Sequence, residues 1–491
     1  MQKTVNVTNS GMVIRPYRKY KSKVLEYETS KWDPVYHKRQ PVSGFYNDDD
    51  DSFATHKFDI NFIRSLFPTH EIVYEPVIFG LPLSNPYTVN DYIEFTESQE
   101  NVLAQSLTYL NSYHKLFINV PTGVGKTLMT IELISKLNRK CIIFCYSTKI
   151  LRQWEDELMT NTNIGNGKIL ILESSNVMEK IRNGEIKFDI SNIDIFLITQ
   201  SLLDSYCKRY GWDKLTDLYN KLGIGIQIID EAHRRMAATI KLNAYVNPNY
   251  HIYLSADFNQ ANYENRRHFF KVFNDVPVTT VSDTEMVKLK HIKAVVCKFD
   301  SNPPVDAILD ITVNRYHWDL FKFVKYQHST KKIYRITRDI IHKIHKTEPK
   351  MKKPYKILIL LNMIEHVDDY TNMLRMDFPN CSVGKVHSAM DEDERNESLK
   401  ADIIVSTYQS FSTGLNLMEP KIRHCISTAP VDIVSNNQAA GRCRQIDGLW
   451  SYYWMIVDTS FEFCIKNLNR SLAYLQRSKI GAITNIDMKG Y

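Results

Sequence analysis

The sequence predicts an α/β protein with two domains, each a parallel sheet flanked by helices, and a small N-terminal accessory region. Apolar runs of strand length alternate with amphipathic stretches of helix length between Phe95 and about Val281. The same alternation begins again after Pro354. Short β-branched runs separated by helical patterns are typical of parallel sheets covered by helices on both faces. A chain of 491 residues is long enough for more than one such core.

Domain boundaries follow from where this alternation starts and stops. The first residues are polar and include the acidic run Asp48–Asp51, which is typical of a solvated loop. The stretch Pro349–Pro354 has the composition of a linker. The predicted segments are an N-terminal accessory region, partly flexible, at 1–90, a first α/β domain at 91–290, a helical linker region at 291–350, a second α/β domain at 351–460 and a C-terminal helical tail at 461–491.

Composition excludes several classes of protein. No run of about 18 apolar residues occurs, so we expect no membrane span. Residues 1–23 lack the apolar core of a signal peptide, so we do not expect secretion. The eight cysteines form no CxxC pair, which favours reduced thiols over a zinc site. We expect an intracellular protein, and its net charge of +7 weakly favours a polyanionic partner.

A phosphate-binding loop is the strongest signal in the chain. The heptapeptide PTGVGKT follows the strand-like KLFINV and precedes the helix-like LMTIELISKL. Glycines let successive backbone N–H groups surround a phosphate, a lysine reaches the β/γ oxygens, and a hydroxyl holds Mg²⁺. The residues predicted to bind ATP here are Pro121, Thr122, Gly123, Val124, Gly125, Lys126 and Thr127.

An acidic pair about 100 residues later completes the pattern of a nucleotide hydrolase. Asp230 and Glu231 lie in IQIIDEAH, at the end of another apolar strand. Asp230, with Thr127, is suited to holding Mg²⁺, and Glu231 to polarising the attacking water. The two motifs together predict an ATP hydrolase that uses ATP and Mg²⁺.

With these motifs the chain resembles the superfamily-2 helicases of the DEAH type, over roughly residues 95–460. The resemblance implies two tandem RecA-like domains. It also implies that Gln99 reads adenine and that His233 couples hydrolysis to strand binding, although His233 is also compatible with a local structural role. The segments YSTKILRQW, LITQSLL and FSTGLNL resemble strand-contact motifs. The implied nucleic-acid contacts are Ser147, Thr148, Lys149, Thr199, Gln200 and Thr413, and Gly414 is an implied ATP contact.

The segment QAAGRCRQ resembles the family motif that supplies arginines to the γ-phosphate. Gln438, Arg442 and Arg444 are the implied catalytic residues, and arginine suits this role because it stays charged and offers several donors. Arg444 comes one residue earlier than the family spacing, so Arg442 is the better candidate. A second departure is Asp257, which stands where the family has threonine in its Ser/Thr-Ala-Thr motif and leaves the coupling of hydrolysis to unwinding open.

The compact layout is similar to helicases of large DNA viruses, such as the poxvirus transcript-release helicase and its iridovirus and mimivirus counterparts. This similarity implies a role in viral transcription or replication, in a host cytoplasm or nucleus or in a virion. The predicted function is ATP-dependent movement along, or unwinding of, DNA or RNA. Two alternatives stay open: a motor subunit of a larger complex that translocates without unwinding, and an NTP-binding scaffold without turnover.

Overall fold

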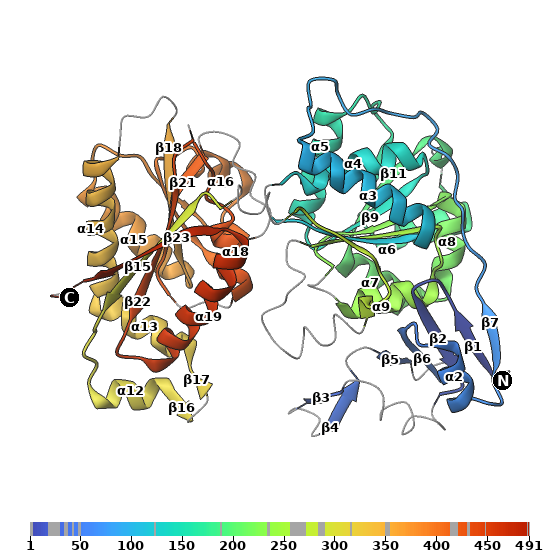
Figure 1. Cartoon of the computed structure of the whole chain (residues 1–491), viewed down its shortest axis with the longest axis horizontal. Helices are drawn as coiled ribbons and strands as arrows, with labels where there is room; N and C mark the ends of the chain where they lie inside the picture. The colour runs from blue at the N-terminus through green and yellow to red at the C-terminus, as the bar shows by residue number, and fades with distance from the viewer. Residues whose placement is uncertain are drawn as a thin grey trace. The chain divides into compact units, whose positions relative to one another are not determined.

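A computed structural model of the chain describes most of its residues. It forms two compact units, Met1–Val281 and Ser282–Tyr491, which are described separately below (Figure 1). The described residues are 3–17, 30–33, 38–41, 44–47, 51–121, 124–186, 189–232, 236–255, 272–282, 290–314, 317–348, 354–412, 421–429, 433–446, 448–488 and 490. No helix among these residues is long and apolar enough to cross a membrane.

The first unit contains a seven-stranded sheet in which every pairing is parallel. Its order is β10-β11-β9-β12-β13-β8-β14, so the strand-length apolar runs between Phe95 and Val281 lie in one sheet. The strands are β8 Lys115–Asn119, β9 Cys141–Cys145, β10 Ile169–Ile171, β11 Ile195–Thr199, β12 Ile226–Ile229, β13 Tyr250–Ser255 and β14 Val278–Thr279.

Helices cover both faces of this sheet, as the sequence predicted. Figure 1 shows α3, α4 and α5 on one face and α7 and α9 on the other. Side chains alternate between the faces along each strand. Phe117 therefore packs with Tyr206 of α7 and Ile240 of α9 in one core. The helices are α3 Glu97–Tyr113, α4 Lys126–Leu137, α5 Thr148–Asn161, α6 Ser175–Asn183, α7 Gln200–Tyr210, α8 Lys214–Leu222 and α9 Met236–Tyr245.

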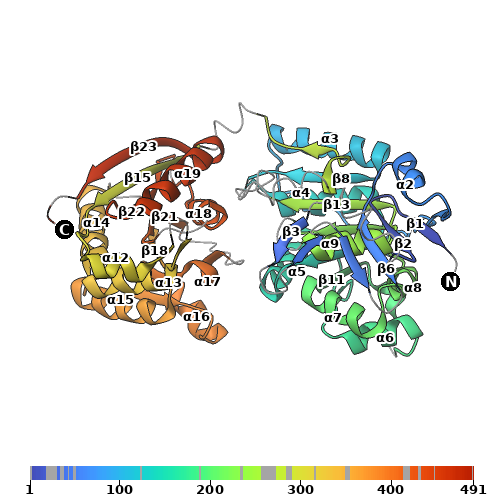
Figure 2. The ribbon, with the colours of Figure 1, turned by 90° about the horizontal axis from the view of Figure 1, so that it is seen from below.

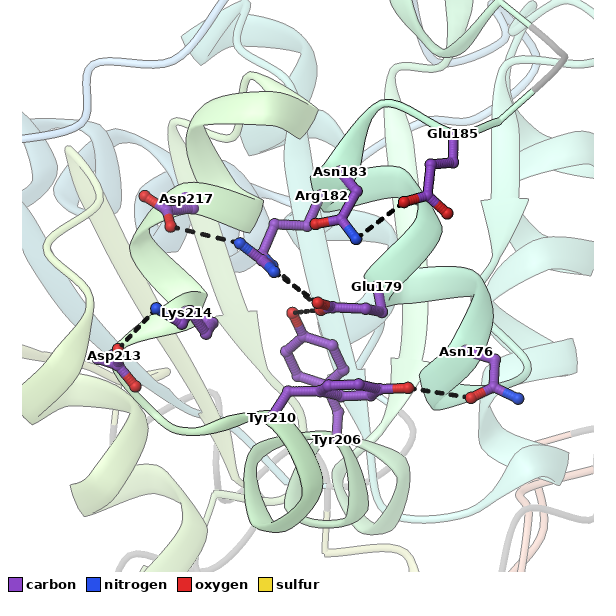
Figure 3. Close-up of polar contacts among 10 residues, drawn as sticks. All are labelled: Asn176, Glu179, Arg182, Asn183, Glu185, Tyr206, Tyr210, Asp213, Lys214 and Asp217. Atoms are coloured by element: carbon purple, nitrogen blue, oxygen red, sulfur yellow. Dashed lines mark hydrogen bonds and ion pairs between the residues drawn. The ribbon is translucent and has the colours of Figure 1, made fainter.

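Polar contacts join α6, α7 and α8 at the surface of the unit (Figure 3). The Glu179 carboxylate accepts hydrogen bonds from Arg182 Nε at 3.0 Å and from the Tyr206 hydroxyl at 3.0 Å. Arg182 also lies 3.7 Å from Asp217 of α8. Arg182 and the Tyr206 hydroxyl both lower the pKa of Glu179, Arg182 the more strongly. The network includes no residue that the sequence assigned to a site, and it serves to align three helices.

The described part of the N-terminal accessory region is folded. It forms a five-stranded sheet in the order β5-β6-β2-β1-β7, with α2 packed against it. The strands are β1 Thr4–Val7, β2 Gly11–Arg15, β5 Gly44–Asn47, β6 Ser52–His56 and β7 Glu71–Tyr74, with α2 at Ile60–Leu66 and a separate hairpin of β3 Ser30–Asp33 and β4 Lys38–Pro41.

This small sheet is docked on α9, the first helix after the acidic pair, and Figures 1 and 2 both show the two side by side. The buried Asn247 side chain accepts a hydrogen bond from the Asn9 N–H at 2.9 Å and donates to the Glu75 carbonyl at 2.8 Å. A Cβ on Gly11 would lie 2.8 Å from the backbone of Ala244, so close approach requires glycine there. The accessory region is therefore part of the first unit.

The second unit is built on another seven-stranded sheet with parallel pairings, in the order β19-β20-β18-β21-β22-β15-β23. Figure 1 shows α14 and α15 on one face and α18 and α19 on the other. The strands are β15 Ile292–Phe299, β18 Tyr355–Leu361, β19 Val383–Val386, β20 Ile403–Thr407, β21 Lys421–Ser427, β22 Ser451–Asp458 and β23 Ile480–Asp487. The remaining elements are α12 Val305–Ile311, β16 Thr312–Asn314, β17 His317–Trp318, α13 Leu320–Thr330, α14 Lys332–Thr347, α15 Ile364–Asp377, α16 Glu392–Ser398, α17 Tyr408–Ser412, α18 Ile433–Ala440 and α19 Glu462–Ser478.

Two predicted boundaries are revised by this sheet. Residues 291–350 were predicted to be a helical linker region, but β15 lies inside the sheet between β22 and β23. Its two faces are buried in two different cores, with Ala294 in one and Val295 in the other. The tail at 461–491 is likewise not wholly helical, because it ends in β23. The stretch Pro349–Pro354 lies largely outside the described residues, and the elements that flank it, α14 and β18, both belong to the second unit.

Candidate nucleotide-binding site

The predicted phosphate loop connects β8 to α4, as a phosphate-binding loop requires. Gly125 precedes the first residue of α4 with φ at +82°, in the left-handed region that favours glycine. Lys126 and Thr127 occupy the first turn of the helix, where free N–H groups favour an anion. Thr122 and Gly123 lie outside the described residues.

Gln99 supports this loop from α3. Its Nε2 donates to the Val124 carbonyl at 2.8 Å, and its Oε1 accepts from the Thr96 N–H at 2.8 Å. Thr96 and Gln99 thus form a capping box at the start of α3. A Cβ on Gly125 would lie 2.6 Å from Gln99 Nε2, so the glycine also makes room for this contact. The structure gives Gln99 a role in holding the loop, and adenine reading by this residue stays a prediction.

The acidic pair lies two strands away from the loop at the same edge of the sheet. β8, β13 and β12 are neighbours and parallel, so their carboxyl ends meet at one edge. Asp230 follows the end of β12, and Glu231 has a φ of +49° that turns the chain sharply. Ser255, two residues before Asp257, ends β13 between them. Asp257 itself lies outside the described residues.

Lys126 and Glu231 meet although 105 residues separate them. Lys126 Nζ lies 3.5 Å from Glu231 Oε1, with 12% and 18% of the two side chains exposed. The Asp230 carboxylate next to them is 8% exposed and accepts the Glu231 N–H at 2.9 Å. Three of the predicted catalytic residues therefore form one cluster. His233 lies outside the described residues.

Two residues of α5 complete the surroundings of Asp230, and the sequence had not singled them out. The indole Nε1 of Trp154 donates to Asp230 Oδ2 at 3.1 Å. Glu157, one turn further along α5, is held by Gln153 through a hydrogen bond of 2.7 Å. Trp154 is the last residue of the segment YSTKILRQW, but nothing in that segment indicates a contact with Asp230.

Burial dominates the electrostatics of this cluster. It raises the pKa of the Asp230 carboxyl, and Glu231 adds to that rise, while Lys126 and the Trp154 indole oppose it. Burial also raises the pKa of Glu157, which lies close enough to Asp230 to repel it. Concentrated carboxylate oxygens in a buried site favour a cation beside them.

The donor set suits Mg²⁺. Carboxylate and hydroxyl oxygens are the ligands this ion prefers, and it is usually held by one or two carboxylates together with substrate phosphates. Asp230 and Thr127 offer one of each beside the loop. Within the described residues no group of three or more histidine, cysteine, aspartate or glutamate side chains is placed to form a metal cage. A metal bound here would supply positive charge to the phosphate oxygens.

The predicted strand-contact residues lie at the carboxyl ends of β9 and β11, which are neighbours in the sheet. Ser147 caps α5 by accepting the Ile150 N–H, and Thr199 caps α7 by accepting the Leu202 N–H. Thr148 and Lys149 occupy the first turn of α5, and Thr148 is exposed.

Gln200 and Thr413 differ from this group. Gln200 is 2% exposed, and its amide makes no hydrogen bond to any residue that the structure describes. The side chain therefore lies below the surface, and a direct strand contact by it stays a prediction. Thr413 and the predicted ATP contact Gly414 lie outside the described residues.

The second unit places its arginines at the end of α18. Gln438 is half-buried on the helix, and Arg442 follows in the turn, with its guanidinium 5.9 Å from the centre of the Phe411 ring. Arg444 turns back to donate to the Gly441 carbonyl, and its backbone N–H pairs with Ile422 of β21. Burial lowers the pKa of Arg444. These contacts give Arg444 a structural role. The assignment of Arg442 to the γ-phosphate stays a prediction.

Similarity to known proteins covers part of the chain. Residues 92–260 match the family described as "Type III restriction enzyme, res subunit". The chain is 29% identical over 165 residues to "Putative helicase 161L" of Invertebrate iridescent virus 6, a match covering 33% of each protein. It is 31% identical over 117 residues to the general transcription and DNA repair factor IIH helicase/translocase subunit XPB of Enterocytozoon bieneusi, covering 24% of this chain and 19% of that one.

Among solved structures, S. cerevisiae Dbp5 bound to RNA and ADP BeF3 is similar with a TM-score of 0.53 and 12% identity, over 81% of this chain and 95% of that one. At this identity the match establishes the fold, which is that of two tandem RecA-like domains with a small N-terminal mixed sheet. The predicted resemblance to superfamily-2 helicases, including one of an iridovirus, is confirmed. The matched segments span a third or less of the two curated relatives.

Proposed function

We propose that this chain is a superfamily-2 motor that hydrolyses ATP to move along, or unwind, a nucleic acid. The observation that carries the proposal is the cluster of Lys126, Asp230 and Glu231 at the carboxyl edge of the first sheet. The lysine is placed to bind phosphate oxygens, and Glu231 to orient the attacking water. Asp230, with Thr127, would hold Mg²⁺.

Arg442 supplies the second half of the proposed site. It stands on the other α/β unit, in the turn after α18, with its guanidinium 5.9 Å from the centre of the Phe411 ring. An arginine that touches the γ-phosphate stabilises the charge of the transition state. Because the phosphate loop belongs to the first unit, ATP binding and hydrolysis would draw the two units together and release them.

Nucleic acid is the proposed partner of the carboxyl edge. Ser147, Thr148 and Lys149 begin α5 beside the nucleotide cluster, at a helix N-terminus that can bind a strand phosphate. The similarity to an iridovirus helicase supports a role in viral transcription or replication inside a host cell. Both DNA and RNA are candidates for the nucleic acid that the motor binds.

A motor subunit of a larger complex is the second candidate. The similarity to a protein named as a helicase/translocase subunit favours it, and so does Asp257 in place of threonine, because translocation does not require duplex opening. An inactive scaffold is disfavoured, because Lys126, Asp230 and Glu231 are all present and in contact. A strand-displacement assay run beside a translocation assay separates the first two candidates.

The decisive assay for this function compares ATP hydrolysis without polymer and with single-stranded DNA, duplex DNA or RNA. We expect at least one polymer to raise the steady-state rate severalfold, because strand binding and hydrolysis share one edge of the sheet. Rates that are equal in all four conditions would exclude a nucleic-acid motor, and no hydrolysis in any condition would favour the scaffold.

A further inference from the structure

We propose that Trp154 is a positioning residue that links the strand-contact end of α5 to the Asp230 carboxylate. The inference rests on the proposed function and extends it, because it names a physical connection between polymer binding and the nucleotide cluster. Trp154 belongs to neither the phosphate loop nor the acidic pair, and it reaches the site from a third element.

The contact is specific and buried. The indole N–H is a donor that cannot accept, and a buried indole requires an acceptor. Trp154 is 1% exposed, and its Nε1 lies 3.1 Å from Asp230 Oδ2. The other oxygen, Oδ1, accepts the backbone N–H of Glu231 at 2.9 Å. Two donors from two different elements therefore fix the orientation of the carboxylate that is to hold the metal.

The position of Trp154 on α5 joins this carboxylate to the proposed strand contacts. Trp154 lies five residues after Lys149, about 8 Å along the helix axis at roughly 1.5 Å per residue. Leu151, Trp154 and Leu158 form the buried face of the same helix. A displacement of the first turn by a bound strand would move the helix as a unit and shift the indole relative to Asp230.

The groups around Asp230 make its orientation consequential. Lys126 and Glu231 face it, Glu157 faces it from the next turn of α5, and the thiol of Cys145 lies at the end of β9. The Glu231 and Glu157 carboxylates repel Asp230 and the Lys126 ammonium attracts it, so its orientation depends on the two donors that hold it. Outer partners of metal ligands commonly change metal affinity by about 10- to 100-fold when they are removed.

The test replaces Trp154 with phenylalanine, which keeps an aromatic ring and removes the N–H. The matched control is Trp454→Phe, because Trp454 in the second unit is also buried and donates its Nε1–H to His424 Nδ1 at 3.2 Å. A second variant carries benzothienylalanine at position 154, which retains the indole shape without the donor. Thermal melting of each full-length variant establishes that it is folded.

The first readout is equilibrium binding of a fluorescent ADP analogue in excess Mg²⁺ and in EDTA, which needs no turnover. We expect the increase in ADP-analogue affinity that Mg²⁺ causes to be smaller by about 10-fold or more in both position-154 variants. Their affinity in EDTA should stay within about twofold of wild type. Trp454→Phe should match wild type in both buffers. The proposal would be overturned if Mg²⁺ raised the ADP-analogue affinity of the position-154 variants as much as that of wild type. It would also be overturned if Trp454→Phe reduced this Mg²⁺-dependent increase as much as they do.

The second readout is the ratio of ATP hydrolysis with and without the most stimulatory polymer. We expect this ratio to fall toward one in the position-154 variants and to stay at the wild-type value in Trp454→Phe. An unchanged ratio would overturn the proposed link to strand binding. If wild type itself shows neither Mg²⁺-dependent nucleotide binding nor polymer stimulation, the proposed function fails as well, so the two failures are distinguishable.

Discussion

Lys126→Ala is expected to reduce polymer-stimulated ATP hydrolysis by at least about 100-fold, which is the size of effect seen when one preorganised charge donor is removed from a transition state. The lysine begins α4 at the end of the phosphate loop, and its ammonium group lies 3.5 Å from Glu231 Oε1. Alanine keeps the helix and removes the charge. The measurement is the steady-state rate at saturating ATP and polymer.

Lys136→Ala is the matched control for that change. Lys136 stands on the same helix and pairs with Glu132 at 3.0 Å, with 47% of its side chain exposed. Pairs four residues apart on a helix contribute roughly 0.3–0.5 kcal/mol, so the control should fold and hydrolyse ATP like wild type. Retention of more than a tenth of wild-type activity in Lys126→Ala would place the phosphate elsewhere.

Arg442→Ala is expected to have a comparable or larger effect on hydrolysis and a small effect on nucleotide binding. Arginines that reach the γ-phosphate accelerate hydrolysis by about 10³-fold or more. They act on the transition state, so the loss should appear in kcat rather than in the affinity for ATP. Single-turnover hydrolysis and equilibrium binding of an ATP analogue measure the two quantities separately.

Two other arginines of the second unit serve as controls for Arg442→Ala. Arg470 lies exposed on α19 and should tolerate alanine without a change in rate. Arg444→Ala should instead lower the melting temperature, because the half-buried guanidinium donates to the Gly441 carbonyl. A loss of roughly 1–3 kcal/mol is typical for leaving a buried group without its partner. A wild-type kcat in Arg442→Ala would remove this residue from the site.

The strands that carry chemistry could be predicted from the sequence because their signals are local. KLFINV and IQII are apolar runs, and each is followed at once by candidate site residues. The parallel sheet then brings Lys126 and Glu231 together, since carboxyl ends of neighbouring strands share an edge. A contact between residues far apart in the sequence can therefore be predicted when both follow neighbouring strands of a parallel sheet.

Elements that depend on remote partners could not be predicted in the same way. β15 pairs with β22 about 160 residues later, and a short apolar run among charges does not identify that partner. The N-terminal sheet depends on Asn247 and Ala244, which follow its last strand by 170 residues or more (244 − 74 = 170). The contact of Trp154 with Asp230 depends on how α5 packs beside β12. Hydrophobic periodicity shows that one face of α5 is buried, but it does not show which acceptor the Trp154 indole contacts.

We propose that a nucleotide held by the first unit is contacted by Arg442 of the second. The most direct test is pulsed electron resonance between one spin label on each unit, at the exposed positions Tyr113→Cys and Met376→Cys in a Cys381→Ser background. We predict that a non-hydrolysable ATP analogue with Mg²⁺ and polymer will convert a broad distance distribution into a narrow one. The change should be absent in Lys126→Ala and weakened in Arg442→Ala. A distribution that nucleotide and polymer leave unchanged would contradict the account.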